Sequence, residues 1–134
     1  MGTVVVGYVA KPEGEAALAA AIDEAQRREA RLVVVNSHRV GRDPAAVDDV
    51  AADETLDGVR ARLDETGLSY DLRRLVRGFE PAEDLIAIAQ ESDAELLVIG
   101  LRRRSPVGKL ILGSNAQRIL LDAPCPVLAV KGLD

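Results

Sequence analysis

The chain alternates short apolar runs, rich in β-branched residues, with longer segments that have the apolar spacing of helices. Most of the runs are continuously apolar, which is typical of strands in a parallel sheet covered on both faces. The run near residue 70 carries charge and alternates, and this predicts a less buried strand. The five runs are Thr3–Val9, Leu32–Asn36, Leu68–Val76, Glu95–Gly100 and Pro126–Lys131.

Four segments between these runs repeat apolar residues every three or four positions, which gives each predicted helix one apolar face. These residues are Leu18, Ala21, Ile22 and Ala25; Ala52, Leu56, Val59 and Leu63; Ala82, Leu85, Ile86 and Ala89; and Ala116, Ile119, Leu120 and Ala123. Pro12 and Pro81 stand where a first helical turn would begin, and Gly67 follows the second helix. Proline and glycine are favoured at these two positions.

The order βαβαβαβαβ predicts an α/β fold. Right-handed crossovers and short connections favour a single five-stranded parallel sheet, doubly wound, with strand order 3-2-1-4-5 and helices on both faces. The 134 residues have the length of one domain, and the 48% hydrophobic content supplies a core. We therefore expect one domain over residues 1–134, without internal repeats or linkers.

Composition excludes several classes of function. Two tyrosines and one phenylalanine are too few for a platform that stacks single-stranded nucleic acid. The net charge of −5 disfavours non-specific binding to nucleic acid or to anionic membranes. The apolar runs fall short of the ~20 residues that span a bilayer, and no secretory signal is evident. One cysteine and one histidine argue against a disulfide or a metal centre. We expect a cytoplasmic protein.

In doubly wound sheets, ligands bind outside the carboxyl ends of the strands, where the strand order reverses. The predicted order places this point between the first and fourth strands. The segments that follow these two strands, Val9–Gly14 and Leu101–Ser114, are therefore the predicted ligand-binding region.

The second of these segments combines glycines, a helix start and a cluster of cations. The cations are Arg102, Arg103, Arg104 and Lys109. Helix N-terminal amides and arginines form anion sites, so Gly113 would admit a phosphate and Ser114 would donate a hydroxyl. The same residues also have a structural interpretation. Ser114 and Gln117 have the spacing of a capping box, Gly113 suits a turn, and the arginines suit a solvated loop or an interface.

The segment is not a known phosphate-loop motif. Gly108 and Lys109 are followed by Leu110 rather than serine or threonine, and Arg103 stands where a P-loop has its first glycine. The dinucleotide pattern GxGxxG is also absent from the chain.

Along nearly its whole length the chain resembles the universal stress protein family. The family's nucleotide signature is a glycine, two residues, a glycine, nine residues and Gly-Ser. Gly100, Gly113 and Ser114 fall on this spacing. Residues 116–130 resemble the family's last helix and strand, and residues 78–82 resemble the turn before its third helix.

The resemblance implies a dimeric, stress-associated binding protein that holds ATP, with magnesium, or another phosphate ligand at residues 100–114. The implied binding residues are Gly100, Arg103, Gly108, Gly113, Ser114 and Asn115. Two positions depart from the family. Arg103 replaces the middle glycine, and Val9 stands where nucleotide-binding members have an aspartate. Valine accepts no hydrogen bond from a ribose or an adenine, so the loop is degenerate.

Two alternatives follow from these departures. The chain could be an interaction or scaffold protein that no longer binds nucleotide, with the arginine loop contacting a protein partner. It could also be a weak ATPase, which ranks last because no general base is evident beside the loop. We assign no catalytic residue: His38 is expected in a loop, and Cys125 as a small, buried apolar side chain.

The resemblance also implies a homodimer that forms through the last strand, Pro126–Lys131. An edge strand has unpaired backbone groups, and a two-fold related copy can satisfy them.

Overall fold

The computed structural model describes residues 2–9, 11–37, 48–75, 81–101 and 113–132. The strands are Thr3–Tyr8 (β1), Arg31–Ser37 (β2), Tyr70–Leu75 (β3), Leu96–Leu101 (β4) and Val127–Lys131 (β5). The helices are Pro12–Arg28 (α1), Asp48–Thr66 (α2), Pro81–Glu91 (α3) and Ser114–Asp122 (α4). Each predicted strand and helix is present.

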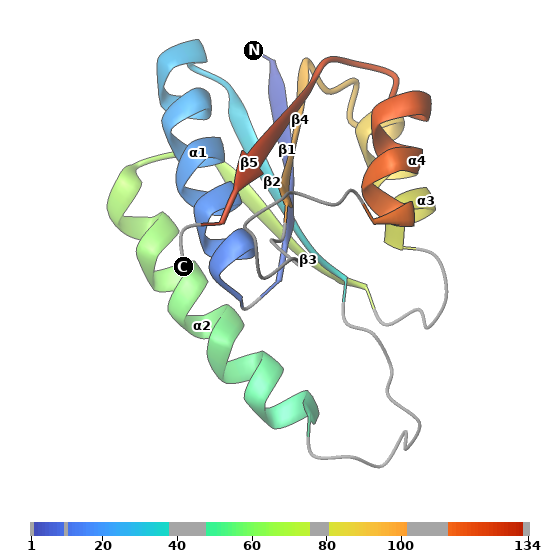
Figure 1. Cartoon of the computed structure of the whole chain (residues 1–134). Helices are drawn as coiled ribbons and strands as arrows, with labels where there is room; N and C mark the ends of the chain where they lie inside the picture. The colour runs from blue at the N-terminus through green and yellow to red at the C-terminus, as the bar shows by residue number, and fades with distance from the viewer. Residues whose placement is uncertain (1, 10, 38–47, 76–80, 102–112, 133–134) are drawn as a thin grey trace.

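The five strands form one parallel sheet in the order β3-β2-β1-β4-β5, which confirms the predicted fold. Helices α1 and α2 cover one face, and α3 and α4 cover the other (Figure 1). Strand β1 lies at the centre of the sheet, with β2 on one side and β4 on the other. The strand order therefore reverses between β1 and β4: the chain adds β2 and β3 on one side of β1, and then adds β4 and β5 on the other side.

Alternate residues of β1 belong to two separate cores. Val4 and Val6 pack with α1 and α2, whereas Val5 packs with α3 and α4. All three side chains have no exposed surface. A strand that is buried on both faces favours apolar residues at nearly every position, which explains the continuous runs in the sequence. Residues 70–73 of the outermost strand β3 are only half-buried, as predicted.

The predicted roles of proline and glycine at the helix ends are confirmed. Pro12 occupies the first turn of α1, where the missing N–H costs nothing. Gly67 follows α2 with a φ of 75°, a left-handed conformation that favours glycine. Strand β5 begins at Val127, one residue later than predicted, although the Pro126 carbonyl still accepts a hydrogen bond from the Leu97 N–H at 3.0 Å.

Two details of α4 differ from the prediction. Gly113 is the N-cap and Ser114 is the first helical residue, without a side-chain capping bond, so the capping-box interpretation is wrong. The reason is that the Gly113 carbonyl accepts the Gln117 N–H at 3.0 Å, which starts the helix one residue earlier. Leu120 was expected on the buried face, but it is 41% exposed, while Ile119 is 3% exposed. This nine-residue helix buries only a narrow stripe.

Among the described helices, none combines the length and the apolar character that crossing a membrane requires.

Candidate functional site

The end of β1 and the end of β4 lie side by side, and the helices that follow them leave on opposite faces of the sheet (Figure 1). This divergence opens the edge of the sheet between α1 and α4. It is the reversal point at which the sequence predicted a ligand.

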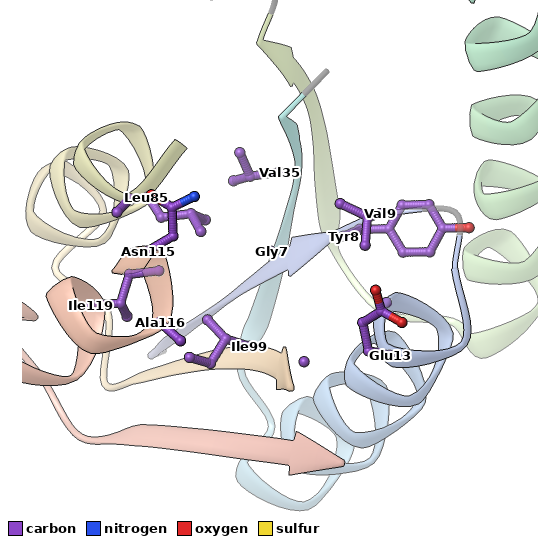
Figure 2. Close-up of a pocket in the computed structure, with 13 residues that line it drawn as sticks. Gly7, Tyr8, Val9, Glu13, Val35, Leu85, Ile99, Asn115, Ala116 and Ile119 are labelled. Atoms are coloured by element: carbon purple, nitrogen blue, oxygen red, sulfur yellow. The ribbon is translucent and has the colours of Figure 1, made fainter. Parts of the chain in front are cut away.

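A pocket of about 170 Å³ occupies this place. Its wall is mostly apolar, with β1, β2 and β4 at the base and α1, α3 and α4 around it (Figure 2). The lining residues are Gly7, Tyr8, Val9, Glu13, Gly14, Val35, Ala82, Leu85, Ile99, Gly100, Asn115, Ala116 and Ile119. A site of this kind suits a ligand with a flat apolar part and a few polar groups at its ends.

The N-terminus of α4 forms one side of the pocket. Asn115 and Ala116 line it, and residues 113–115 are exposed. The first N–H groups of a helix have no acceptor within the helix, and they carry the positive end of its dipole. This side of the pocket therefore presents amide donors that suit an anion.

Gly113 leaves open space at this helix start. Its φ is −69°, which any residue adopts, and no atom of the described chain lies within 4 Å of an added β-carbon. Neither the backbone conformation nor the described packing requires glycine here. The absence of a side chain instead leaves the α4 amides accessible.

Glycines fit tightly on the α1 side of the pocket. A β-carbon at Gly14 would collide with the Val9 carbonyl, and one at Gly100 would collide with the Glu13 carbonyl. A β-carbon at Gly132 would lie 2.9 Å from the Glu13 backbone nitrogen. The start of α1 therefore packs closely against the ends of β4 and β5, and Gly100 has a packing role whatever the pocket binds.

Val9 lines the pocket with 37% of its surface exposed. It offers no polar group at the position of the family's aspartate. Among the described lining residues, the only carboxylate is that of Glu13. Glu13 lies within the predicted segment Val9–Gly14, but the sequence did not single it out. An acidic residue in the first turn of a helix suits the helix dipole and is by itself no signal of a ligand.

Tyr8 is the second residue that sequence reasoning missed. Tyr8 lines the pocket, but its ring points away from α3 and α4 and packs in the core on the α1 and α2 side (Figure 2). Its hydroxyl donates a hydrogen bond to Glu15 Oε1 at 2.6 Å. Arg62 of α2 in turn contacts Glu15 Oε2 at 2.9 Å. Burial, reinforced by the hydrogen bond to Glu15, holds the pKa of Tyr8 well above its usual value. The hydroxyl is thus bound on the α1 and α2 side of the sheet.

The structure brings together only part of the predicted site. Gly100 and Asn115 line the pocket, and Gly113 and Ser114 lie at the start of α4 beside it. Arg103 and Gly108 lie outside the described residues, together with the other cations of the loop and His38.

Two further observations concern metal and redox chemistry. Within the described ranges, no group of three or more His, Cys, Asp or Glu side chains could hold a metal ion. Cys125 is half-buried, and burial raises the pKa of its thiol, which disfavours the reactive thiolate.

Comparisons with known proteins agree with this geometry. The family model described as the universal stress protein family matches residues 1–131. A universal stress protein of Mycolicibacterium smegmatis is 45% identical over 128 residues, which cover 96% of each chain. The structure of a universal stress protein from Archaeoglobus fulgidus is similar, with a TM-score of 0.79 and 37% identity, covering 98% of this chain and 99% of that one.

A universal stress protein structure from Archaeoglobus fulgidus in complex with dAMP is also similar. Its TM-score is 0.73 and its identity is 31%, and the match covers 98% of each chain. The family match and the relatives agree over nearly the whole chain. This chain therefore belongs to the universal stress protein family.

Proposed function

We propose that this chain is a cytoplasmic, stress-associated protein that binds an adenine nucleotide in the pocket between α1 and α4. The observation that carries the proposal is the open N-terminus of α4, which adjoins an apolar pocket at the reversal point of the sheet. The apolar wall suits a purine, and the helix amides suit a phosphate. The dAMP complex of a 31% identical relative supports this choice of ligand.

Some of the proposed binding residues lie at the described pocket, and others belong to the loop before α4. Gly113, Ser114 and Asn115 would contact the phosphates, and Gly100 would form the pocket floor. Arg103 and Gly108 of the connecting loop complete the proposed set. We include ATP among the ligands, and magnesium would enter with the triphosphate.

The test is a thermal shift with ATP and magnesium at low salt. We expect the wild-type protein to be stabilised by millimolar ATP, because a ligand that binds only the folded state raises the melting temperature. Gly113→Val should abolish the shift, since its side chain would occupy the open space before α4. Gly58→Ala is the matched control, because Gly58 lies on α2 with no described atom within 4 Å of its added β-carbon. No shift for the wild-type protein would contradict the proposal.

A second candidate function is a protein-interaction module without nucleotide. The apolar side chain of Val9 at the pocket wall favours it, because a site that lacks a polar anchor binds polar ligands less well. Mass spectrometry of small molecules released from the purified protein separates the two functions. Nucleotide retained through purification would exclude this second candidate.

We also propose that the protein is a homodimer that forms through the C-terminal strand. Strand β5 lies at one end of the sheet, with β4 as its only neighbour among the described strands. The Pro126 carbonyl and the Gly132 N–H both bond to β4. Because backbone groups alternate along a strand, those of Val127, Ala129 and Lys131 face the open edge, where a second copy could pair with them.

A further inference from the structure

We propose that Glu13 is a ligand-selecting residue of the pocket, whose carboxylate accepts hydrogen bonds from the vicinal hydroxyls of a ribose. This inference rests on the proposed nucleotide site and adds a selectivity that the family resemblance does not supply. It assigns to Glu13 the acceptor role that Val9 leaves vacant.

The first observation is the position of Glu13. It lines the pocket together with Val9 and Tyr8, on the side formed by α1. Figure 2 shows Asn115, Ala116 and Ile119 of α4 across from it. One side of the pocket thus presents amide donors and the other presents a carboxylate, with apolar side chains between. This arrangement is complementary to a molecule that carries an anion and hydroxyl donors on an apolar body.

The second observation is that the main chain at Glu13 is held in place. A β-carbon at Gly100 would collide with the Glu13 carbonyl oxygen. A β-carbon at Gly132 would lie 2.9 Å from the Glu13 backbone nitrogen and 2.9 Å from its Cα. The Gly132 N–H also bonds to the Leu101 carbonyl at 3.1 Å, which ties the contact to the end of β4. A fixed main chain limits where the carboxylate can reach, and this preorganisation favours binding.

The third observation is that the carboxylate is available. Within the described residues, no hydrogen bond or ion pair engages the side chain of Glu13. Glu15, two residues later, is already committed to Tyr8 and Arg62. The two acidic residues of this turn therefore have different roles: Glu15 joins α1 to α2, whereas Glu13 lines the pocket and its carboxylate has no partner among the described residues.

The chemistry selects the ligand group. A carboxylate carries two acceptor oxygens, which match two adjacent hydroxyls, and in dinucleotide-binding doubly wound sheets an Asp or Glu side chain binds a ribose hydroxyl. Its charge at the same time repels a phosphate. Glu13 should therefore weaken anion binding in general and favour those anions that also carry a diol.

The test compares ATP with 2′,3′-dideoxy-ATP by isothermal titration calorimetry. The wild-type protein should prefer ATP by at least about tenfold, because hydrogen bonds to a charged acceptor are strong. Glu13→Gln should remove the preference by weakening ATP and by leaving the dideoxy analogue unchanged or tighter. Glu65→Gln removes the same charge at the exposed end of α2 and should keep the preference.

The opposite outcomes are distinct. If Glu13 acts only by repulsion, Glu13→Gln will tighten both ligands equally, and the inference is overturned. Equal affinity of the wild-type protein for both ligands also overturns the role of Glu13, but it does not contradict the proposed nucleotide site. No binding of either ligand overturns the nucleotide function as well. Glu13→Asp keeps the charge but withdraws it by one methylene, so it should also lose the preference and provides a second variant if Glu13→Gln folds poorly.

Discussion

The backbone of Glu13 lies directly against Gly100, so closely that a β-carbon at residue 100 would collide with the Glu13 carbonyl oxygen. This contact joins the end of β4 to the first turn of α1 at the wall of the pocket. Gly100 is the first glycine of the family's nucleotide signature, and the structure gives it a packing role that does not depend on a ligand.

Gly100→Ala should destabilise the fold, because the new methyl group forces β4 and α1 apart. We expect a loss of about 1–3 kcal/mol in the free energy of unfolding, the usual range for overpacking. Gly58→Ala on α2 meets no described atom within 4 Å and should instead stabilise the protein by about 0.5–1 kcal/mol. Urea denaturation of both variants checks the pair. Equal effects at the two positions would show that the Glu13 contact is not tight.

Gly113→Asp should separate stability from ligand binding. An aspartate at the N-cap can accept hydrogen bonds from the first amides of α4, which would raise the stability by a few tenths of a kcal/mol. Its negative charge would stand where we place the phosphate, so ATP should no longer raise the melting temperature. Thermal melts with and without ATP measure both effects. An ATP shift that survives the substitution would move the phosphate away from this helix.

Tyr8→Phe should change the response of the protein to alkaline pH. The pKa of Tyr8 is raised in the folded state, so its contribution to stability is complete below the unfolded value near 10. Above that pH the unfolded chain loses the proton while the folded chain keeps it, and stability falls as the pH rises.

The Tyr8→Phe variant should therefore show a smaller loss of stability above pH 10 than the wild-type protein does. Tyr70→Phe is the comparison, because the pKa of Tyr70 is raised chiefly by a hydrogen bond to Asp64 at an exposed site. Denaturant titrations across the alkaline range would test this. An unchanged slope in Tyr8→Phe would argue against the buried bond to Glu15.

Ala129→Pro should dissociate the proposed dimer without unfolding the sheet. The N–H of Ala129 faces the open edge of β5, so proline removes a group that β4 does not use, and proline is tolerated at such edges. Leu128→Pro removes an N–H on the β4 side and should destabilise the fold as well. Sedimentation equilibrium and circular dichroism separate the two effects. A dimer that persists in Ala129→Pro would place the interface elsewhere.

Leu63→Ala and Leu121→Ala should differ strongly. Leu63 has no exposed surface and packs in the core beneath α2, so its truncation should cost about 2–5 kcal/mol. Leu121 is 83% exposed on α4, and its truncation should change stability by no more than about 0.5 kcal/mol. Chemical denaturation measures both. A large effect at Leu121 would reveal a contact with another copy of the chain.

Much of this architecture could be read from the sequence. The apolar run at Thr3–Tyr8 predicts a central strand, because a strand buried on both faces strongly favours apolar residues. Pro12 and Gly67 mark helix ends through their own backbone preferences. Strand order and the reversal point then follow from general rules of chain connection, which need no knowledge of side-chain contacts.

Other features were decided only by tertiary structure. The N-cap of α4 falls on Gly113 rather than Ser114, because the path of the chain into the helix, not side-chain type, determines which carbonyl accepts the first bond. Leu120 is exposed because α4 meets its neighbours along a narrow stripe. Glu13 and Asn115 stand 102 positions apart in the sequence and line one pocket, since parallel strands bring their carboxyl ends to the same edge. The apolar periodicity of the sequence shows which face of a helix or strand is apolar. It does not show which polar side chains come together at the edge of the sheet, because that depends on packing between segments that are distant in the sequence.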